Sequence, residues 1–210
     1  MNSSRLNSIA LSGFNPSTVD VKVGCISLIS IATEPEPQTC TCPDTAWLNY
    51  CVSGTASRNA NGGVQSDDGT MRSAPALVDS SLALQPADTA SYWYSLQDCV
   101  DVSSSPILYL NVTANAGATF NIKLQSSANE CADSAQLQSA SVSSAQYGSM
   151  NGGAVVLRIP LEDYRKVNAG FDAKSIYAVV LDGFSDGKGT YSIHCASFGN
   201  ATVSGVAALA

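Results

Sequence analysis

The sequence predicts an all-β protein, a jelly-roll β-sandwich of two antiparallel sheets, with an extra strand pair at the N-terminus. Three observations predict this class. Only 13% of the 210 residues are charged, which is typical of short strands and polar turns and not of long surface helices. Several segments alternate apolar and polar residues with the period of a half-buried strand. Clusters of Gly, Ser and Asn separate these segments, as turns do between the strands of a sandwich.

By pattern the chain has four parts. Residues 1–31 are expected to form a strand pair, residues 32–45 a Pro-rich linker, residues 46–200 the jelly-roll sandwich and residues 201–210 a C-terminal tail. The linker contains TEPEPQTCTCPDT, in which alternating prolines disfavour helix and remove the donors of a strand ladder. A chain of 210 residues has room for one sandwich of this size with a segment left over.

The N-terminal strand pair echoes the end of the sandwich. Laid over one another without a gap, residues 6–28 and 176–198 share the frame L-x-G-F-(ten residues)-C-x-S. Each copy has an apolar run, a Gly-Phe corner and an alternating strand with a Cys, Cys25 or Cys195, on its inner face. Two strands cannot bury an apolar face alone. We therefore expect residues 1–31 to be the last two strands of a preceding copy in a tandem array, able to self-associate; chance similarity of strand patterns is the alternative.

Each element of the sandwich has its own pattern. The clearest strand is 118–125, in which Phe120, Ile122 and Leu124 alternate with polar residues. The segment 175–184 is apolar on both faces up to Leu181, which predicts a central strand. LEDYRKV, residues 161–167, indicates a helical turn. The other expected strands are 81–87, 91–97, 107–114, 154–161 and 189–198.

Charge and cysteine content indicate the environment. The net charge of −7 leaves no basic surface for phosphates, so neither nucleic acid nor an anionic membrane is expected as a partner. No segment is long and apolar enough to span a membrane, and any signal peptide has been removed or lies upstream. Seven cysteines with a single His do not suit zinc and predict disulfides, hence an oxidising compartment and a secreted or extracellular location. Sequons at Asn2, Asn111 and Asn200 fit a glycoprotein.

The segment SRNANGGVQSDDGTM, residues 57–71, and the strands that follow it resemble a known family of domains. Residues 51–199 resemble secreted fungal jelly-roll domains, which are similar in turn to family 11 carbohydrate-binding modules and galactose-binding-like sandwiches. In such domains a Trp commonly follows the Gly pair, where this chain has Val64. The matching residues are Asn59, Gly62, Gly63, Ser66 to Met71, Tyr92 to Tyr94, and the VVLDGF strand.

The resemblance implies a pairing of cysteines. In this type of sandwich the first strand lies beside the last, so Cys51 is expected to pair with Cys195. Cys99 and Cys131 flank two neighbouring strands and are expected to pair with each other. Cys25 is left to pair with Cys40 or Cys42, and one thiol stays free or pairs between chains.

The resemblance also implies a non-catalytic carbohydrate-binding module of a secreted or cell-wall-associated fungal protein, which binds a polysaccharide or another glycan. Such binding needs an aromatic face for the sugar C–H surface with polar groups beside it. By strand alternation Tyr92 and Tyr94 share one face and Trp93 takes the other. Trp93 is the stacking candidate if it points outward and a core residue if it points inward. The full candidate set is Trp93, Tyr92, Tyr94, Tyr109, Tyr177 and Arg158.

The sequence offers weaker candidates for metal binding and for catalysis. No cofactor is required, although Asp67 and Asp68, with Asp182 from a distant turn, are candidate ligands for a structural Ca²⁺. No catalytic residue is expected: His194 should point outward from its strand, and no G-x-S-x-G elbow is present. Two alternatives remain, a structural or adhesive extracellular domain without glycan binding, and a polysaccharide-active enzyme that uses acids such as Glu162 or Asp163.

Overall fold

The computed structural model describes residues 48–49, 55–127 and 137–200. The chain divides into two units, Met1–Thr39 and Cys40–Ala210, and the described residues all belong to the second. The predicted strand pair, the linker and the tail lie outside the described residues, as do Cys25, Cys40 and Cys42 with their pairing.

Within the described ranges, eleven strands form two antiparallel sheets. One sheet has the order β3-β4-β11-β6-β9, with β1 added along β11. The other, which we call the five-stranded sheet, has the order β2-β5-β10-β7-β8. The strands are β1 Leu48–Asn49, β2 Gln65–Ser66, β3 Met71–Val78, β4 Ser81–Pro86, β5 Trp93–Val100, β6 Ile107–Thr113, β7 Asn121–Ser127, β8 Leu137–Ser143, β9 Ala154–Pro160, β10 Ile176–Asp182 and β11 Tyr191–Gly199.

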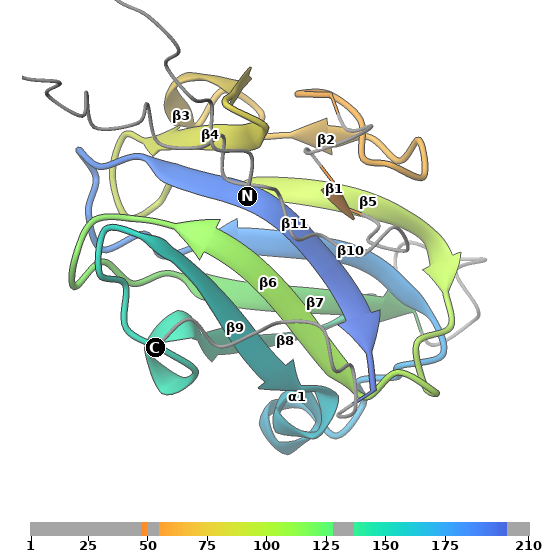
Figure 1. Ribbon diagram of the computed structural model, residues 1–210. Helices are drawn as coiled ribbons and strands as arrows, with labels where there is room; N and C mark the ends of the chain where they lie inside the picture. The colour runs from red at the N-terminus through yellow and green to blue at the C-terminus, as the bar shows by residue number, and fades with distance from the viewer. Residues whose placement is uncertain (1–47, 50–54, 128–136, 201–210) are drawn as a thin grey trace, which may run out of the picture. The chain divides into compact units, whose positions relative to one another are not determined.

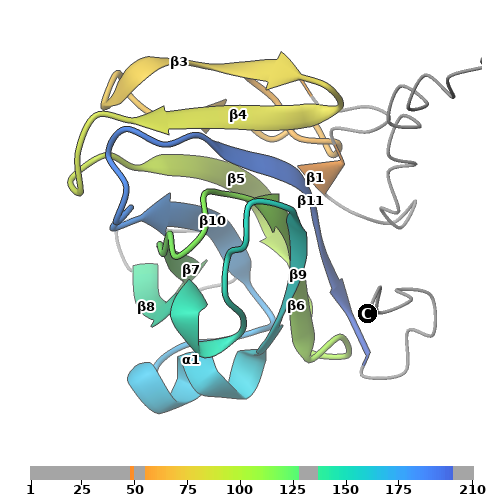
Figure 2. The same ribbon diagram turned by 60° about the vertical axis from the view of Figure 1, so that its left-hand side comes forward.

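The two sheets stack face to face, as the sequence predicts for a jelly roll (Figures 1 and 2). The chain changes sheet at each step from β4 to β7, and again from β8 to β11 at every step. β10 is central in the five-stranded sheet, which confirms the prediction of a central strand at 175–184, and β11 is central in the other sheet. The first described strand lies beside the last, because Leu48 pairs with Ala196.

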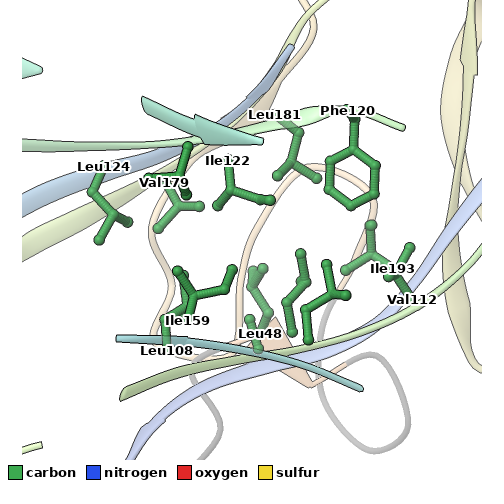
Figure 3. Packing of buried hydrophobic residues seen from close by; sticks show 14 of the residues in the cluster. Leu48, Leu108, Val112, Phe120, Ile122, Leu124, Ile159, Val179, Leu181 and Ile193 are labelled. Atoms are coloured by element: carbon green, nitrogen blue, oxygen red, sulfur yellow. The ribbon is translucent and has the colours of Figure 1, made fainter. Parts of the chain in front are cut away.

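The core lies between the sheets and is built from every second side chain. Figure 3 shows Ile122, Leu124, Val179 and Leu181 of the five-stranded sheet facing Leu108, Val112, Ile159 and Ile193 of the other. All of these side chains are buried. Because burial of one such side chain contributes roughly 1.5–3 kcal/mol, this interior is the main source of stability. The alternation predicted for 107–114 and 118–125 is confirmed here.

The predicted helical turn forms the helix α1, Leu161–Val167. Acidic Glu162 and Asp163 occupy its first turn and basic Arg165 and Lys166 its last, as the helix dipole favours. The inward residues Leu161 and Tyr164 are buried, and α1 contacts β8 and β9 at one end of the sandwich (Figure 2).

One prediction about β11 is wrong. Cys195 was expected on the inner face with Ile193, but the register shifts between these two residues. Ile193 pairs with Val112 in the core, whereas Cys195 pairs with Asn111 on the outward side. Cys195 is still buried, at 5% exposure, but its neighbour Ala196 takes the place in the core. A β-bulge of this kind changes which face a side chain takes.

The described residues include only some of the cysteines in the predicted disulfides. Cys99 and Cys195 are each disulfide-bonded. Their expected partners, Cys131 and Cys51, lie outside the described residues, so the connectivity stays a prediction. Within the described part of the chain, no helix has the length and apolar character needed to cross a bilayer.

Candidate functional site

The outward face of the five-stranded sheet carries a pair of tyrosines. Trp93 points inward and is fully buried, so Tyr92 and Tyr94 on either side of it point outward. The two tyrosine rings lie 6.4 Å apart between centroids, with an angle of only 21° between their planes. Two nearly parallel rings, one at the start of β5 and one directly before it, make a short aromatic platform.

This platform lies in an open cleft of about 530 Å³. The cleft runs over β5, β10 and β7, which lie side by side in the sheet (Figure 1). Its aromatic and apolar residues come from β5, from the segment just before β5 and from β10, and its polar residues come mainly from β7 and from the end of β10. The lining consists of Asp68, Ala90, Tyr92, Tyr94, Leu96, Lys123, Gln125, Tyr177, Val180 and Asp182.

Asp68 holds both tyrosine hydroxyls. Tyr92 Oη donates to Asp68 Oδ2 at 2.9 Å, and Tyr94 Oη donates to Asp68 Oδ1 at 3.2 Å. Ser66 Oγ donates to the same carboxylate at 2.8 Å, and these bonds, from Ser66 first and Tyr92 next, lower the pKa of Asp68. The pKa of Tyr92 is raised, mainly by its bond to Asp68, and the pKa of Tyr94 is raised, mainly by burial, so both hydroxyls stay protonated donors at neutral pH.

The turn that carries Asp68 is folded by its own sequence. Asp68 and Gly69 both have positive φ, 48° and 76°, which Asp and Gly tolerate better than other residues. The preceding Asp67 turns inward, where its Oδ2 accepts a bond from the Met71 backbone N at 2.9 Å. Adjacent carboxylates therefore diverge: one stabilises the turn and the other faces the cleft.

The far side of the cleft carries an ion pair. Lys123 Nζ lies 2.6 Å from Asp182 Oδ2, and Asn121 Nδ2 donates to Asp182 Oδ1 at 3.1 Å. Gln125, two residues further along β7, contacts Ser139 Oγ at 3.3 Å and also faces the cleft. The site thus combines a tyrosine platform with amide, carboxylate and ammonium groups.

The N-x-x-G-G motif supports the cleft from behind. Asn59 is buried, and its Nδ2 donates to Ser95 Oγ at 2.9 Å and to Leu96 O at 2.8 Å. Gly63 lies so close to β5 that a Cβ would be 2.2 Å from Leu96 O. Val64, where a Trp is common in similar domains, is 44% exposed, and its carbonyl accepts a bond from Leu96 N.

The candidate glycan-binding residues separate into three groups. Tyr92, Tyr94 and Tyr177 all line the cleft. Trp93 does not, because its side chain is in the core, and its assignment as a stacking residue is wrong. Tyr109 and Arg158 lie on the other sheet, where they pair across β6 and β9. The Arg158 guanidinium lies 5.6 Å from the Tyr109 ring centroid.

The calcium candidates do not converge on one cluster. Asp67 bonds to the backbone of its own turn, Asp68 to three hydroxyls and Asp182 to Lys123. Among the described residues no group of three or more His, Cys, Asp or Glu side chains is placed to hold a metal ion.

The residues considered for catalysis are engaged in local contacts. His194 lies on the outward side of β11, as predicted, with its Nε2 2.9 Å from Thr113 Oγ1, and burial lowers its pKa. Asp163 bonds to Lys166 at 2.7 Å and accepts a bond from Tyr147 Oη at 3.1 Å. Glu162 pairs with Arg165 at 3.7 Å. None of these three residues lines the cleft.

Sequence reasoning missed Lys123 and Gln125 and named Asp68 and Asp182 only as calcium candidates. Lys123 and Gln125 lie on the outward side of β7, and their alternation with Leu124 was visible in the sequence. Nothing in the sequence, however, showed that β7 lies one strand away from β5, across β10.

The fold is that of solved carbohydrate-binding modules. The family 30 carbohydrate-binding module of the cellulosomal cellulase Cel9D-Cel44B of Clostridium thermocellum matches with a TM-score of 0.54 and 17% identity, over 75% of this chain and 98% of that chain. Another family 30 module matches with a TM-score of 0.46 and 18% identity, over 66% and 74% of the two chains. The family 11 module of the cellulosomal cellulase Lic26A-Cel5E of Clostridium thermocellum matches with a TM-score of 0.42 and 12% identity, over 57% of this chain and 75% of that chain.

At these identities the likeness shows the fold, and the predicted β-sandwich is confirmed. No family model matches the sequence, and no curated protein matches it.

Proposed function

We propose that the protein is a non-catalytic carbohydrate-binding module that binds a polysaccharide in the cleft of the five-stranded sheet. The observation that carries the proposal is the pair of parallel tyrosine rings, fixed by Asp68 and flanked by Lys123, Gln125 and Asp182. Aromatic faces stack on the C–H surfaces of sugar rings, and amide and charged groups beside them bond the hydroxyls. The family 30 fold supports the same function.

The setting that we propose is extracellular, including the cell wall. Cys99 and Cys195 are disulfide-bonded, and disulfides persist mainly in oxidising compartments. A polysaccharide outside the cell would be accessible to a protein in that location.

The test is a pull-down of the purified chain on chitin, β-glucan and cellulose. We expect retention on at least one polymer, and the double variant Tyr92→Ala/Tyr94→Ala should weaken it at least about tenfold, since aromatic contacts carry much of such binding. The matched control is Tyr109→Ala, which removes a half-buried outward tyrosine from the other sheet and should leave retention unchanged.

Two results would contradict the proposal. If no polymer retains the wild-type chain, the structural or adhesive alternative is favoured instead. If Tyr109→Ala weakens retention as much as the double variant does, the polysaccharide does not bind in the cleft.

A further inference from the structure

Among the residues that the structure describes, one cation lines the cleft, and that cation is already paired. Among the described residues that line the cleft, three are charged: Asp68, Lys123 and Asp182. Lys123 Nζ lies 2.6 Å from Asp182 Oδ2, while Asp182 Oδ1 accepts the bond from Asn121. Both oxygens of Asp182 are therefore engaged, and the charge of Lys123 is balanced within the site.

Asp68 is the charge that stays unbalanced. Its partners are the hydroxyls of Ser66, Tyr92 and Tyr94, which are neutral groups. Hydrogen bonds stabilise a carboxylate without cancelling its charge. Two carboxylates and one ammonium leave the cleft with one net negative charge, on a chain whose total is −7.

This arrangement has a consequence for the kind of polysaccharide that fits. A uronate or a sulfated sugar carries a fixed anion, and proteins bind such anions through Arg or Lys groups with free donors. In this cleft the anion would meet the Asp68 carboxylate and would have to compete with Asp182 for Lys123. A neutral sugar brings only hydroxyls and C–H faces and meets neither obstacle.

We propose that the cleft selects uncharged polysaccharides and rejects polyuronates and other polyanions, with Asp182 as the residue that determines this selection. The proposal rests on the proposed function and deepens it. Asp182 has this role because it pairs with the one lining cation, which would otherwise be available to an anionic sugar.

The experiment compares polymers that share a backbone and differ in charge. Hydroxyethyl cellulose is paired with carboxymethyl cellulose, glycol chitin with carboxymethyl chitin, and a soluble β-1,3-glucan with its carboxymethyl derivative, in affinity gel electrophoresis at pH 7. The neutral ethers control for the bulk of the substituent. We expect wild type to bind at least one neutral polymer on the order of tenfold more tightly than its anionic counterpart, with the ratio falling as salt screens the charges.

Three variants assign the effect to the cleft. Asp182→Asn keeps the shape of the side chain but frees Lys123, and should lower the neutral-to-anionic ratio by about threefold or more. Lys123→Met should raise the ratio. The control Asp79→Asn makes the same change of total charge in the β3–β4 turn of the other sheet, where φ is 46° and Asn is well tolerated, and should leave the ratio as in wild type.

The outcomes separate the two proposals. Equal binding of a neutral polymer and its carboxymethyl derivative by wild type overturns the charge selection while the proposed function stands. If Asp79→Asn lowers the neutral-to-anionic ratio as much as Asp182→Asn does, the effect comes from total charge, and the role of Asp182 is overturned. Binding of anionic polymers alone also overturns the charge selection, whereas failure to bind any of the polymers, neutral or anionic, overturns the proposed function itself.

Discussion

Gly63 offers the sharpest test of how the loop before β2 supports the cleft. A Cβ at this position would lie 2.2 Å from Leu96 O and 2.7 Å from Asn59 Nδ2. Both neighbours are fixed, since Leu96 O belongs to the backbone of β5 and Asn59 is buried. The substitution Gly63→Ala therefore forces the loop away from β5.

The cost follows from the bonds that the movement breaks. Asn59 Nδ2 donates to Ser95 Oγ and Leu96 O, and these two bonds contribute about 1 kcal/mol each. A buried amide left without partners adds about 1–3 kcal/mol. We expect Gly63→Ala to lower the free energy of unfolding by about 3 kcal/mol, which for a domain of this size lowers Tm by roughly 6–12 °C.

The neighbouring Gly62 provides the matched control. Its φ is 86°, but a Cβ there would meet nothing within 4 Å. Gly62→Ala therefore introduces only backbone strain, about 1 kcal/mol. Both variants lose the same freedom in the unfolded chain, so that effect cancels in the comparison.

The assay is thermal unfolding of the two variants, followed by circular dichroism and by Trp fluorescence. We expect Gly63→Ala to lower Tm at least twice as much as Gly62→Ala. Equal losses from the two substitutions would refute the close packing of the loop on β5, and with it the physical reason given for the Gly pair.

Three further predictions follow from burial and from pKa. Trp93→Ala should lower the free energy of unfolding by about 3–5 kcal/mol, because the side chain is fully buried; a urea midpoint unchanged from wild type would contradict its place in the core. The lowered pKa of Asp68 stabilises the fold above the ordinary Asp value of about 3.9, so this contribution should fade as pH falls through the folded pKa, and Asp68→Asn should flatten the acid limb of a Tm–pH profile. Burial and the bond to Asp163 raise the pKa of Tyr147 to about 12. The contribution of Tyr147 to the stability of the fold is therefore present below about pH 10 and lost as pH rises toward 12. Asp163→Asn should shift the rise of tyrosinate absorbance to lower pH, and an unshifted titration would contradict the bond.

The sequence predicted the sandwich because its strands alternate, but alternation does not say which face is the inner one. On β5 the alternation misleads, since Tyr94 and Leu96 look apolar while Ser95 and Gln97 look polar. The structure places Ser95 and Gln97 inside, fully or nearly fully buried. Asn59 Nδ2 and Gln97 Nε2 both donate to Ser95 Oγ. These hydrogen bonds offset the cost of burying polar groups on the inner face of β5.

The candidate site was predicted in part for a related reason. Tyr92, Tyr94, Tyr109 and Tyr177 all follow from outward positions on strands, and no local pattern distinguishes the first two from Tyr109. The difference lies in the order of the strands: Tyr177 is on β10, next to β5, whereas Tyr109 is on β6 in the other sheet. Strand order depends on contacts far apart in sequence, which one unaligned sequence does not reveal.

The S-D-D-G-T-M motif shows why a fold signature and a binding site coincide here. Asp67 bonds to Met71 N and fixes the turn, and Asp68, held at positive φ by the same turn, is thereby directed at the hydroxyls of Tyr92 and Tyr94. A substitution at position 67 should therefore change mainly stability, whereas one at position 68 should change mainly the orientation of the two rings. The turn that Asp67 stabilises thus sets the position of residue 68 beside the two rings, so one short motif contributes both to folding and to the candidate site.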